Sequence, residues 1–384
     1  MRRTLTCCAA AALPFLVHAQ GSEAWQACTG LDDVQRLACY DAWAKSQQPA
    51  PAPLAVTPAP QPSPSPSLQP SPPEITARPA EPPVPPGPEV RRGVRLTATD
   101  DCHDTQHSEL TRFWELTPGA DCGTFGIRGF RPISVAVARA DTVSRQPTSE
   151  NPRNNATSST DYRTTEARLQ LSVRTKVAQG VFAYGERGMD SLWFAYSQLS
   201  YWQVFTPWLS RPFRNTDHEP EVLYVTPVQS ARAGEWRLRL AGLGLVHQSN
   251  GQSLPLSRSW NRVYLMGAAE KGEVQVQARL WHRLDEDTND DNPRISDYVG
   301  RGEVVVRWNA DRQNLFAFTG RHGLRRDAHG SARLEWFHAL ADPGLGMPSG
   351  LRLHTQIFSG YGENLIDYNR ARTVLSIGLS LVEW

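Results

Sequence analysis

HQSNGQSLPLSRSWNR, residues 247–262, has the pattern of a turn between two β-strands. Before it, Arg239 to Val246 alternates apolar with small residues, and after it Val263 to Ala268 resumes an extended apolar pattern. Gly251 and Pro255 interrupt the stretch, as turn residues do. The stretch therefore predicts a β-hairpin, and the rest of the chain follows the same all-β pattern.

The predicted hairpin brings three polar side chains together. If it folds symmetrically about Leu254, then His247 lies opposite Asn261, and directly opposed residues have Cβ atoms about 5 Å apart. Residues two apart on a strand share a face, so Ser249 points to the same side as His247. A nucleophile, a base and an amide would then lie side by side.

The chemistry of these three residues is that of a serine hydrolase. Ser249 becomes a nucleophile when a base takes its proton, and His247 can act as that base near neutral pH. The amide oxygen of Asn261 can accept the imidazole N–H and hold the correct tautomer, as carboxylates do in other hydrolases. Gly251 lets the backbone approach closely, so its N–H is the expected donor to an oxyanion. A His-x-Ser pair alone is usually incidental, so this interpretation depends on the whole motif.

The face on which the three residues lie is otherwise apolar. His247 and Ser249 continue a stripe formed by Ala241, Leu243 and Leu245, and Asn261 continues a stripe formed by Val263 and Leu265. In a soluble sheet this face would be core. In a membrane barrel it would face lipid, with the polar residues at the rim.

Three further motifs accompany the hairpin in one order along the chain. They are PFRNTDHEP (212–220), DDNP (290–293) and SGYGENLIDYN (359–369). Together with HQSNG…SRSWNR they resemble the signature of the outer-membrane phospholipase A family of Gram-negative bacteria. The matching region runs from about Phe125 to the C-terminus. The resemblance implies Ca²⁺-dependent hydrolysis of phospholipid and lysophospholipid acyl esters in the outer membrane, of phospholipase A1/A2 type.

The resemblance also implies roles for individual residues. Ser249 would be the nucleophile, His247 the base and Asn261 the residue that orients the base. The Ca²⁺ ligands would be the backbone carbonyl of Gln252, Ser257, and Ser210 from a second subunit. Gln252 stands where an arginine is familiar, which a backbone ligand tolerates.

An acidic residue of the loop after the hairpin matches a second calcium position of the family. This residue is Asp291. A solvated acidic loop over Asp285 to Asp291 is the alternative interpretation, and both stay open.

Twelve segments from residue 125 onward have the alternation of strands, and an even number is typical of bacterial outer-membrane barrels. They are Gly129–Ala138, Glu166–Thr175, Ser191–Phe205, Glu221–Thr226, Glu235–Val246, Asn261–Ala268, Glu273–Arg283, Gly302–Asn309, Asn314–Gly320, Ser331–Phe337, Leu351–Ser359 and Thr373–Trp384. A terminal aromatic residue on the last strand resembles the assembly signal of such proteins. We therefore predict an all-β, twelve-stranded antiparallel transmembrane β-barrel over residues 125–384.

The composition of the 384 residues agrees with a barrel. A hydrophobic fraction of 40% is that of a soluble protein, but lumen-facing and lipid-facing residues alternate in barrels and conceal their membrane character. No run of about 20 apolar residues occurs, which argues against a helical membrane protein. The net charge of +1 provides no field that would recruit nucleic acid.

The first third of the chain predicts an exported extension. Residues 1–19 have the basic start, apolar run and small-residue end of a signal peptide. Residues 20–46 predict a small helical hairpin, residues 47–89 a Pro/Ala/Ser-rich linker, and residues 90–124 a pre-barrel segment with one short helix near 108–116. Of three possible pairings among the four remaining cysteines, the simplest joins Cys28 to Cys39 and Cys102 to Cys122.

The segment Ser191–Phe205 predicts a dimer interface. Its even positions form the more apolar row, which we assign to the outer face, and Gln198 lies in the middle of that row. An amide without a partner is unfavourable in hydrocarbon, so a second copy is expected to supply one. The resemblance agrees, and it implies a calcium-promoted homodimer. The alternative is a glutamine that faces the lumen after a bulge.

Two other classes of protein remain as alternatives. One is a non-catalytic, porin-like barrel with a vestigial triad. The other is a soluble β-sandwich, acting as a periplasmic esterase.

Overall fold

The computed structural model describes residues 28–30, 32–46, 106–183, 189–211, 213–228, 232–286, 290–340 and 350–381. The chain divides into two compact units, Met1–Glu81 and Pro82–Trp384. The predicted signal peptide, the linker and Trp384 lie outside the described residues.

The N-terminal unit contains one described helix. Helix α1 spans Asp33–Ser46, and Asp32 Oδ1 accepts a hydrogen bond from Gln35 N at 3.0 Å, which caps its first turn. A disulfide joins Cys28 to Cys39, with Cα atoms 5.7 Å apart, and this is the expected pairing. Any helix before Cys28 falls outside the described residues.

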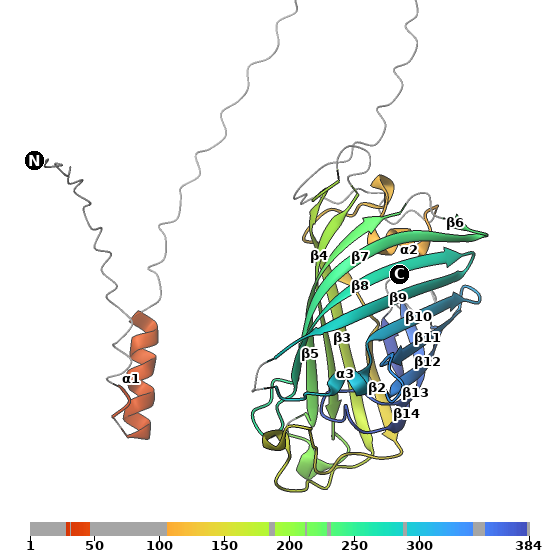
Figure 1. The fold of residues 1–384 in the computed structure, drawn as a ribbon. Helices are drawn as coiled ribbons and strands as arrows, with labels where there is room; N and C mark the ends of the chain where they lie inside the picture. The colour runs from red at the N-terminus through yellow and green to blue at the C-terminus, as the bar shows by residue number, and fades with distance from the viewer. Residues whose placement is uncertain are drawn as a thin grey trace, which may run out of the picture. The chain divides into compact units, whose positions relative to one another are not determined.

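The second unit is a β-barrel (Figure 1). Its twelve long strands are β2 (Ile133–Ala140), β3 (Thr165–Gln179), β4 (Ser191–Trp202), β5 (Asn215–Pro227), β7 (Trp236–Ser249), β8 (Ser259–Lys271), β9 (Val274–Leu284), β10 (Gly302–Asn309), β11 (Asn314–His322), β12 (Gly330–Ala339), β13 (Leu351–Gly360) and β14 (Arg372–Leu381). Two short strands, β1 (Arg128–Gly129) and β6 (Arg232–Ala233), pair with β3 and β7.

The sheet closes because its first and last long strands pair. Antiparallel β14 and β2 align Ile377 with Val137, and each remaining long strand pairs with its neighbours in the chain. Closure leaves no free edge, so each long strand has a hydrogen-bonded neighbour on both sides. The single closed sheet excludes the soluble sandwich. No helix among the described residues is long and apolar enough to cross a membrane.

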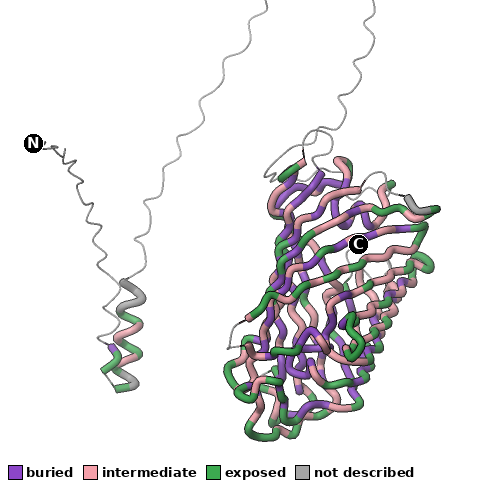
Figure 2. The backbone as a smooth tube through the Cα atoms, in the orientation of Figure 1, coloured by how far each residue is buried: buried purple, intermediate pink, exposed green. Residues whose placement is uncertain are grey.

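Side chains alternate between the lumen and an apolar outer surface. Buried and exposed stretches alternate along the barrel (Figure 2). On β2 the burial pattern switches at every residue, and Val135 is 60% exposed. On β8 the even residues are buried, whereas Leu265 is 64% exposed. Large exposed apolar side chains on successive strands form the lipid-facing surface of a transmembrane barrel.

Several strand bounds differ from the predictions because of proline. The first strand begins at Ile133 rather than Gly129, since Pro132 has no N–H for the ladder and separates β1 from β2. In contrast, β5 extends back to Asn215 through Pro220, which aligns with Tyr196 of β4. The predicted start at Glu221 was therefore wrong, because Pro220 does not end the strand.

The pre-barrel segment is part of the barrel from residue 106 onward. Ser108 caps α2 (Glu109–Trp114), and Phe113 and Trp114 pack against strand residues that include Trp193. Lys176 of β3 contacts Glu115 and Asp121 just after the helix. The described part of the predicted pre-barrel segment therefore packs against strands of the barrel. Cys122 is disulfide-bonded, while Cys102 is outside the described residues.

A second cluster lies at the other end of the barrel from α2. Helix α3 (Ile295–Val299) packs with Trp260, Leu365 and Tyr368. Since α2 packs near Ala268 and α3 near Trp260, the two helices mark opposite ends of β8 (Figure 1). The hairpin of residues 247–262 lies at the α3 end.

Candidate active site

The predicted pairing of the hairpin is confirmed. Strands β7 and β8 align His247 with Asn261 and Ser249 with Ser259. The side chains of the first pair are joined by a hydrogen bond of 2.8 Å between His247 Nδ1 and Asn261 Oδ1. These residues belong to the strands themselves and not to the turn, which is shorter than predicted.

The three residues lie on the outer face of the barrel. His247 is exposed and Ser249 is half-buried, and Leu245 on the same stripe is 55% exposed. Within the described residues no hydrogen bond joins Ser249 to His247, although the two share one face of β7. The hairpin thus presents a hydroxyl, an imidazole and an amide at the lipid-facing rim.

The turn of the hairpin is organised by Asn250. Its Oδ1 accepts hydrogen bonds from Arg258 N (2.9 Å) and Gln252 N (3.3 Å), and its Nδ2 donates to Leu256 O (2.8 Å). Gly251 follows with a φ of +62°, a conformation that favours glycine. Sequence reasoning explained the glycine but missed the buried asparagine that closes the turn.

Two of the predicted metal ligands lie together. Ser257 Oγ donates to Asp291 Oδ2 at 2.6 Å, and Asn154 Nδ2 donates to both Asp291 Oδ1 and Ser257 O at 2.9 Å. Among the described residues, the Oδ1 atom of fully buried Asn154 has no hydrogen-bond partner, so it is an oxygen available to a cation. A carboxylate, a hydroxyl and an amide oxygen are donors that Ca²⁺ prefers, so these residues fit it.

The other two predicted ligands have different contacts in this chain. Ser210 Oγ donates to Pro207 O at 2.9 Å, and the Gln252 amide donates to Arg214 O at 3.3 Å. The structure therefore does not bring either side chain to the Ser257–Asp291 pair. The ligand expected from Gln252 is its backbone carbonyl, and the one expected from Ser210 belongs to a second subunit.

Gln198 faces outward as predicted, but its amide has partners within the chain. Pairing of β4 with β5 is unbroken from Ser191 to Tyr201, so no bulge turns Gln198 into the lumen. Tyr196 Oη donates to Gln198 Oε1, and Gln198 Nε2 donates to Ser200 Oγ, both at 3.1 Å. The premise of an amide without a partner was wrong, because Tyr196 and Ser200, two residues away on the same face, form hydrogen bonds with the amide oxygen and nitrogen.

These contacts continue to the hairpin through His218. Tyr196 Oη lies 2.6 Å from His218 Nδ1, and His218 is aligned with Ser249 across β5 and β7. A Cβ placed on Gly251 would be 3.8 Å from the His218 ring. Sequence reasoning missed His218 and Tyr196, since only the register of three strands places them beside Ser249.

Two of the three other motifs meet in a buried charge cluster. Arg214 donates to Glu166 Oε1 at 2.6 Å and to Asp367 Oδ2 at 2.9 Å, and Arg372 also donates to Asp367, at 2.5 Å. Burial opposes ionisation, yet the two arginines hold the pKa of Asp367 below its usual range. PFRNTDHEP and SGYGENLIDYN are therefore joined by the Arg214–Asp367 ion pair, which supports the loops at the hairpin end.

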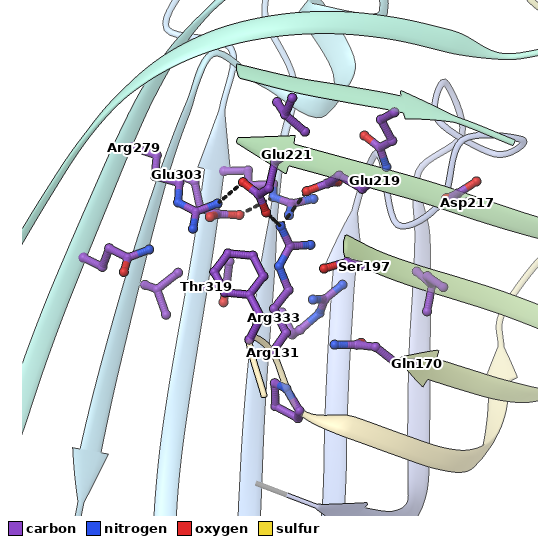
Figure 3. A pocket seen from close by; sticks show the side chains of 18 of the residues that line it. Arg131, Gln170, Ser197, Asp217, Glu219, Glu221, Arg279, Glu303, Thr319 and Arg333 are labelled. Carbon is purple, nitrogen blue, oxygen red and sulfur yellow. Dashed lines mark hydrogen bonds and ion pairs between the residues drawn. The ribbon is translucent and has the colours of Figure 1, made fainter. Parts of the chain in front are cut away.

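The lumen holds a separate cavity lined by paired charges (Figure 3). Arg131 contacts Glu219 at 2.5 Å and Glu221 at 3.4 Å, and Arg279 lies 3.8 Å from Glu221. Tyr264 donates to Glu221 at 2.8 Å. These contacts cross the barrel, and α2 packs at one end, which argues against an open pore.

These features define a class of protein: an outer-membrane β-barrel that carries a His–Asn pair and a serine on its lipid-facing rim. The sequence profile of the family Phospholipase A1 matches residues 110–381. The chain belongs to this phospholipase A1 family.

Individual relatives agree with this assignment. The chain is 35% identical over 219 residues to the phospholipase A1 of Escherichia coli K12, covering 56% of this chain and 69% of the relative. It is 38% identical over 218 residues to a Neisseria meningitidis serogroup B relative, covering 56% of this chain and spanning about half, 54%, of that protein.

Two solved structures share the fold. The Salmonella typhi outer membrane phospholipase dimer with bound calcium is 28% identical, and the outer membrane phospholipase A of E. coli is 29% identical. Each superposes with a TM-score of 0.58, covering 67% of this chain and 93% of the other.

Proposed function

We propose that this barrel hydrolyses the acyl esters of phospholipids and lysophospholipids through an acyl-enzyme on Ser249. The observation that carries the proposal is the 2.8 Å hydrogen bond between His247 Nδ1 and Asn261 Oδ1, on the face where Ser249 lies. This face is apolar and exposed, so an acyl chain in the bilayer can reach the serine without leaving hydrocarbon.

In the proposed reaction His247 Nε2 takes the proton of Ser249 Oγ as the oxygen attacks the acyl carbonyl carbon. The Gly251 N–H stabilises the oxyanion, and the imidazolium then protonates the departing lysophospholipid oxygen. Water, deprotonated by His247, then attacks the acyl-enzyme carbonyl, and the imidazolium returns this proton to Ser249 Oγ as the ester bond breaks and a fatty acid is released.

We further propose that Ca²⁺ is required. Ser257, the backbone carbonyl of Gln252 and Ser210 of a second copy would hold the ion that the family resemblance implies, and Asp291 with Asn154 would serve the second calcium position beside it. When bound, the ion supplies positive charge near the developing oxyanion. A calcium-promoted homodimer through the β4 face would join Ser210 of one copy to the site of the other.

We propose that the N-terminal third contains an export signal followed by a non-catalytic extension. Residues 1–19 would be a signal peptide that exports the chain to the outer membrane. The disulfide-linked residues 20–46 and the linker 47–89 would form an extension outside the catalytic unit.

A fluorophosphonate probe tests the proposal directly. In detergent with Ca²⁺ it should label Ser249, and purified protein should release fatty acid from phospholipid vesicles only when Ca²⁺ is present. Folded barrel that neither labels nor releases fatty acid would favour the porin-like alternative. A soluble periplasmic esterase would instead be extracted from cells without detergent.

A further inference from the structure

The amide of Asn261 lies between the side chains of His247 and Glu286, and the sequence had suggested only the contact with His247. Asn261 Oδ1 lies 2.8 Å from His247 Nδ1, and Asn261 Nδ2 donates to Glu286 Oε1 at 2.9 Å. Glu286 follows β9, two residues beyond Leu284, which is aligned with Asn261. It is therefore the next link in a chain of hydrogen bonds that starts at His247.

The order of these contacts determines which end of the amide faces the imidazole. An asparagine amide has an oxygen that accepts and a nitrogen that donates, and the two ends have nearly the same shape. An ionised carboxylate only accepts, so Glu286 requires the nitrogen end. Asn261 Oδ1 is then left for His247, which must donate from Nδ1 and keep the Nε2 lone pair for the serine proton.

Without such a partner the amide could turn over. Asn261 Nδ2 would then donate to His247 Nδ1, and the proton would move to Nε2, where it prevents His247 from acting as a base. A carboxylate in place of Asn261 would not have this ambiguity. A Ser–His–Asn arrangement therefore needs a group that distinguishes the two ends of the amide.

The carboxylate of Glu286 is held in position by Arg283. Its side chain is 20% exposed, and its second oxygen lies 3.5 Å from Arg283 Nη2, which also contacts Asp290 Oδ1 at 2.6 Å. Burial raises the pKa of Glu286, and Asp290 and Asp291 act in the same direction, while Arg283 and the Asn261 amide oppose them. Mildly alkaline assays keep the carboxyl ionised.

We propose that Glu286 is a positioning residue, whose carboxylate accepts Asn261 Nδ2–H and so fixes Asn261 Oδ1 against the Nδ1–H of His247. The site is then a four-residue chain of Ser249, His247, Asn261 and Glu286. This inference rests on the proposed function for its kinetic consequences, but the His247 tautomer can be measured without turnover.

The kinetic test compares variants that differ in what they offer the amide. Glu286→Leu removes the acceptor, and kcat should fall by about tenfold with little change in KM, since a hydrogen bond to a charged group is lost away from the substrate. Glu286→Gln can bond either end of the amide, so its loss should be smaller. The matched control is Asp285→Asn, which removes a neighbouring exposed negative charge and should leave kcat unchanged.

Rescue distinguishes positioning from a general structural role. In Asn261→Asp/Glu286→Gln the new aspartate can only accept, and the new amide can donate to it, so His247 again donates from Nδ1. Activity of this double variant should exceed that of either single variant, because Asn261→Asp alone places two carboxylates together. Double-variant activity no higher than that of Glu286→Gln would overturn the proposal.

The ¹⁵N chemical shifts of the His247 ring give a readout independent of activity. In wild-type and Asp285→Asn protein they should report one neutral tautomer with the proton on Nδ1, and in Glu286→Leu a mixture. An unchanged tautomer in folded Glu286→Leu protein would overturn the inference. If wild-type protein neither turns over nor labels at Ser249, the proposed function fails, while the tautomer shift still decides the role of Glu286.

Discussion

Lys176 should hold the segment after α2 in the barrel, and its removal should destabilise the fold. Its ammonium lies 2.5 Å from both Glu115 Oε2 and Asp121 Oδ1, and it donates to Gln179 Oε1 at 2.8 Å. The side chain is only 1% exposed. Lys176→Met keeps the volume and removes the cation that these buried acids face.

The expected loss is about 3–5 kcal/mol in the free energy of unfolding, the range found when one partner of a buried ion pair is removed. Glu115 retains an ion pair with Arg128 at 2.5 Å, which favours the lower half of that range. A Lys176→Met/Asp121→Asn variant removes one of the unbalanced acids and should recover much of the loss.

Denaturant unfolding in detergent micelles, followed by tryptophan fluorescence, measures this change, because Trp114 and Trp193 lie beside the pair. The control is Lys271→Met, whose partner Glu235 lies at a similar 2.6 Å but whose side chain is 48% exposed. That exposed pair should contribute less than about 1 kcal/mol. Equal losses in the two variants would refute the reasoning, since burial would then have no effect.

Further predictions concern catalysis, calcium, assembly and the N-terminal extension. Ser249→Ala should abolish fatty acid release without unfolding the barrel, whereas Asn261→Ala should retain a fraction, and complete loss in both would mean that Asn261 does more than orient. Asp291→Asn should raise the Ca²⁺ concentration needed for half-maximal activity; an unchanged Ca²⁺ titration would exclude Asp291 as a ligand. Gln198→Ala should weaken both Ca²⁺-promoted cross-linking in detergent and turnover, and full activity from a species that stays monomeric would refute the dimer. Deletion of residues 20–89 should leave activity intact, so a folded but inactive truncated barrel would contradict the proposed domain division.

The sequence alone was sufficient for the features that depend on neighbouring residues. Alternation with a period of two predicted twelve strands and their outward faces, because each strand buries one side whatever its partner is. The pairing of His247 with Asn261 was also predictable, since a hairpin folded symmetrically about Leu254 places the two residues opposite each other. The disulfide between Cys28 and Cys39 was predictable for a similar reason, because its two cysteines are only 11 residues apart in the sequence.

Only the tertiary structure decided which distant side chains complete the site. Asn154 meets Asp291 across 137 residues, Arg214 meets Asp367 across 153, and His218 reaches Ser249 through strand register. The position of Glu286 beside Asn261 likewise depends on how the chain leaves β9. Periodicity specifies a face of a strand and not the neighbour that this face will meet. That neighbour is determined when the barrel closes and the loops at its rim form hydrogen bonds and ion pairs with one another.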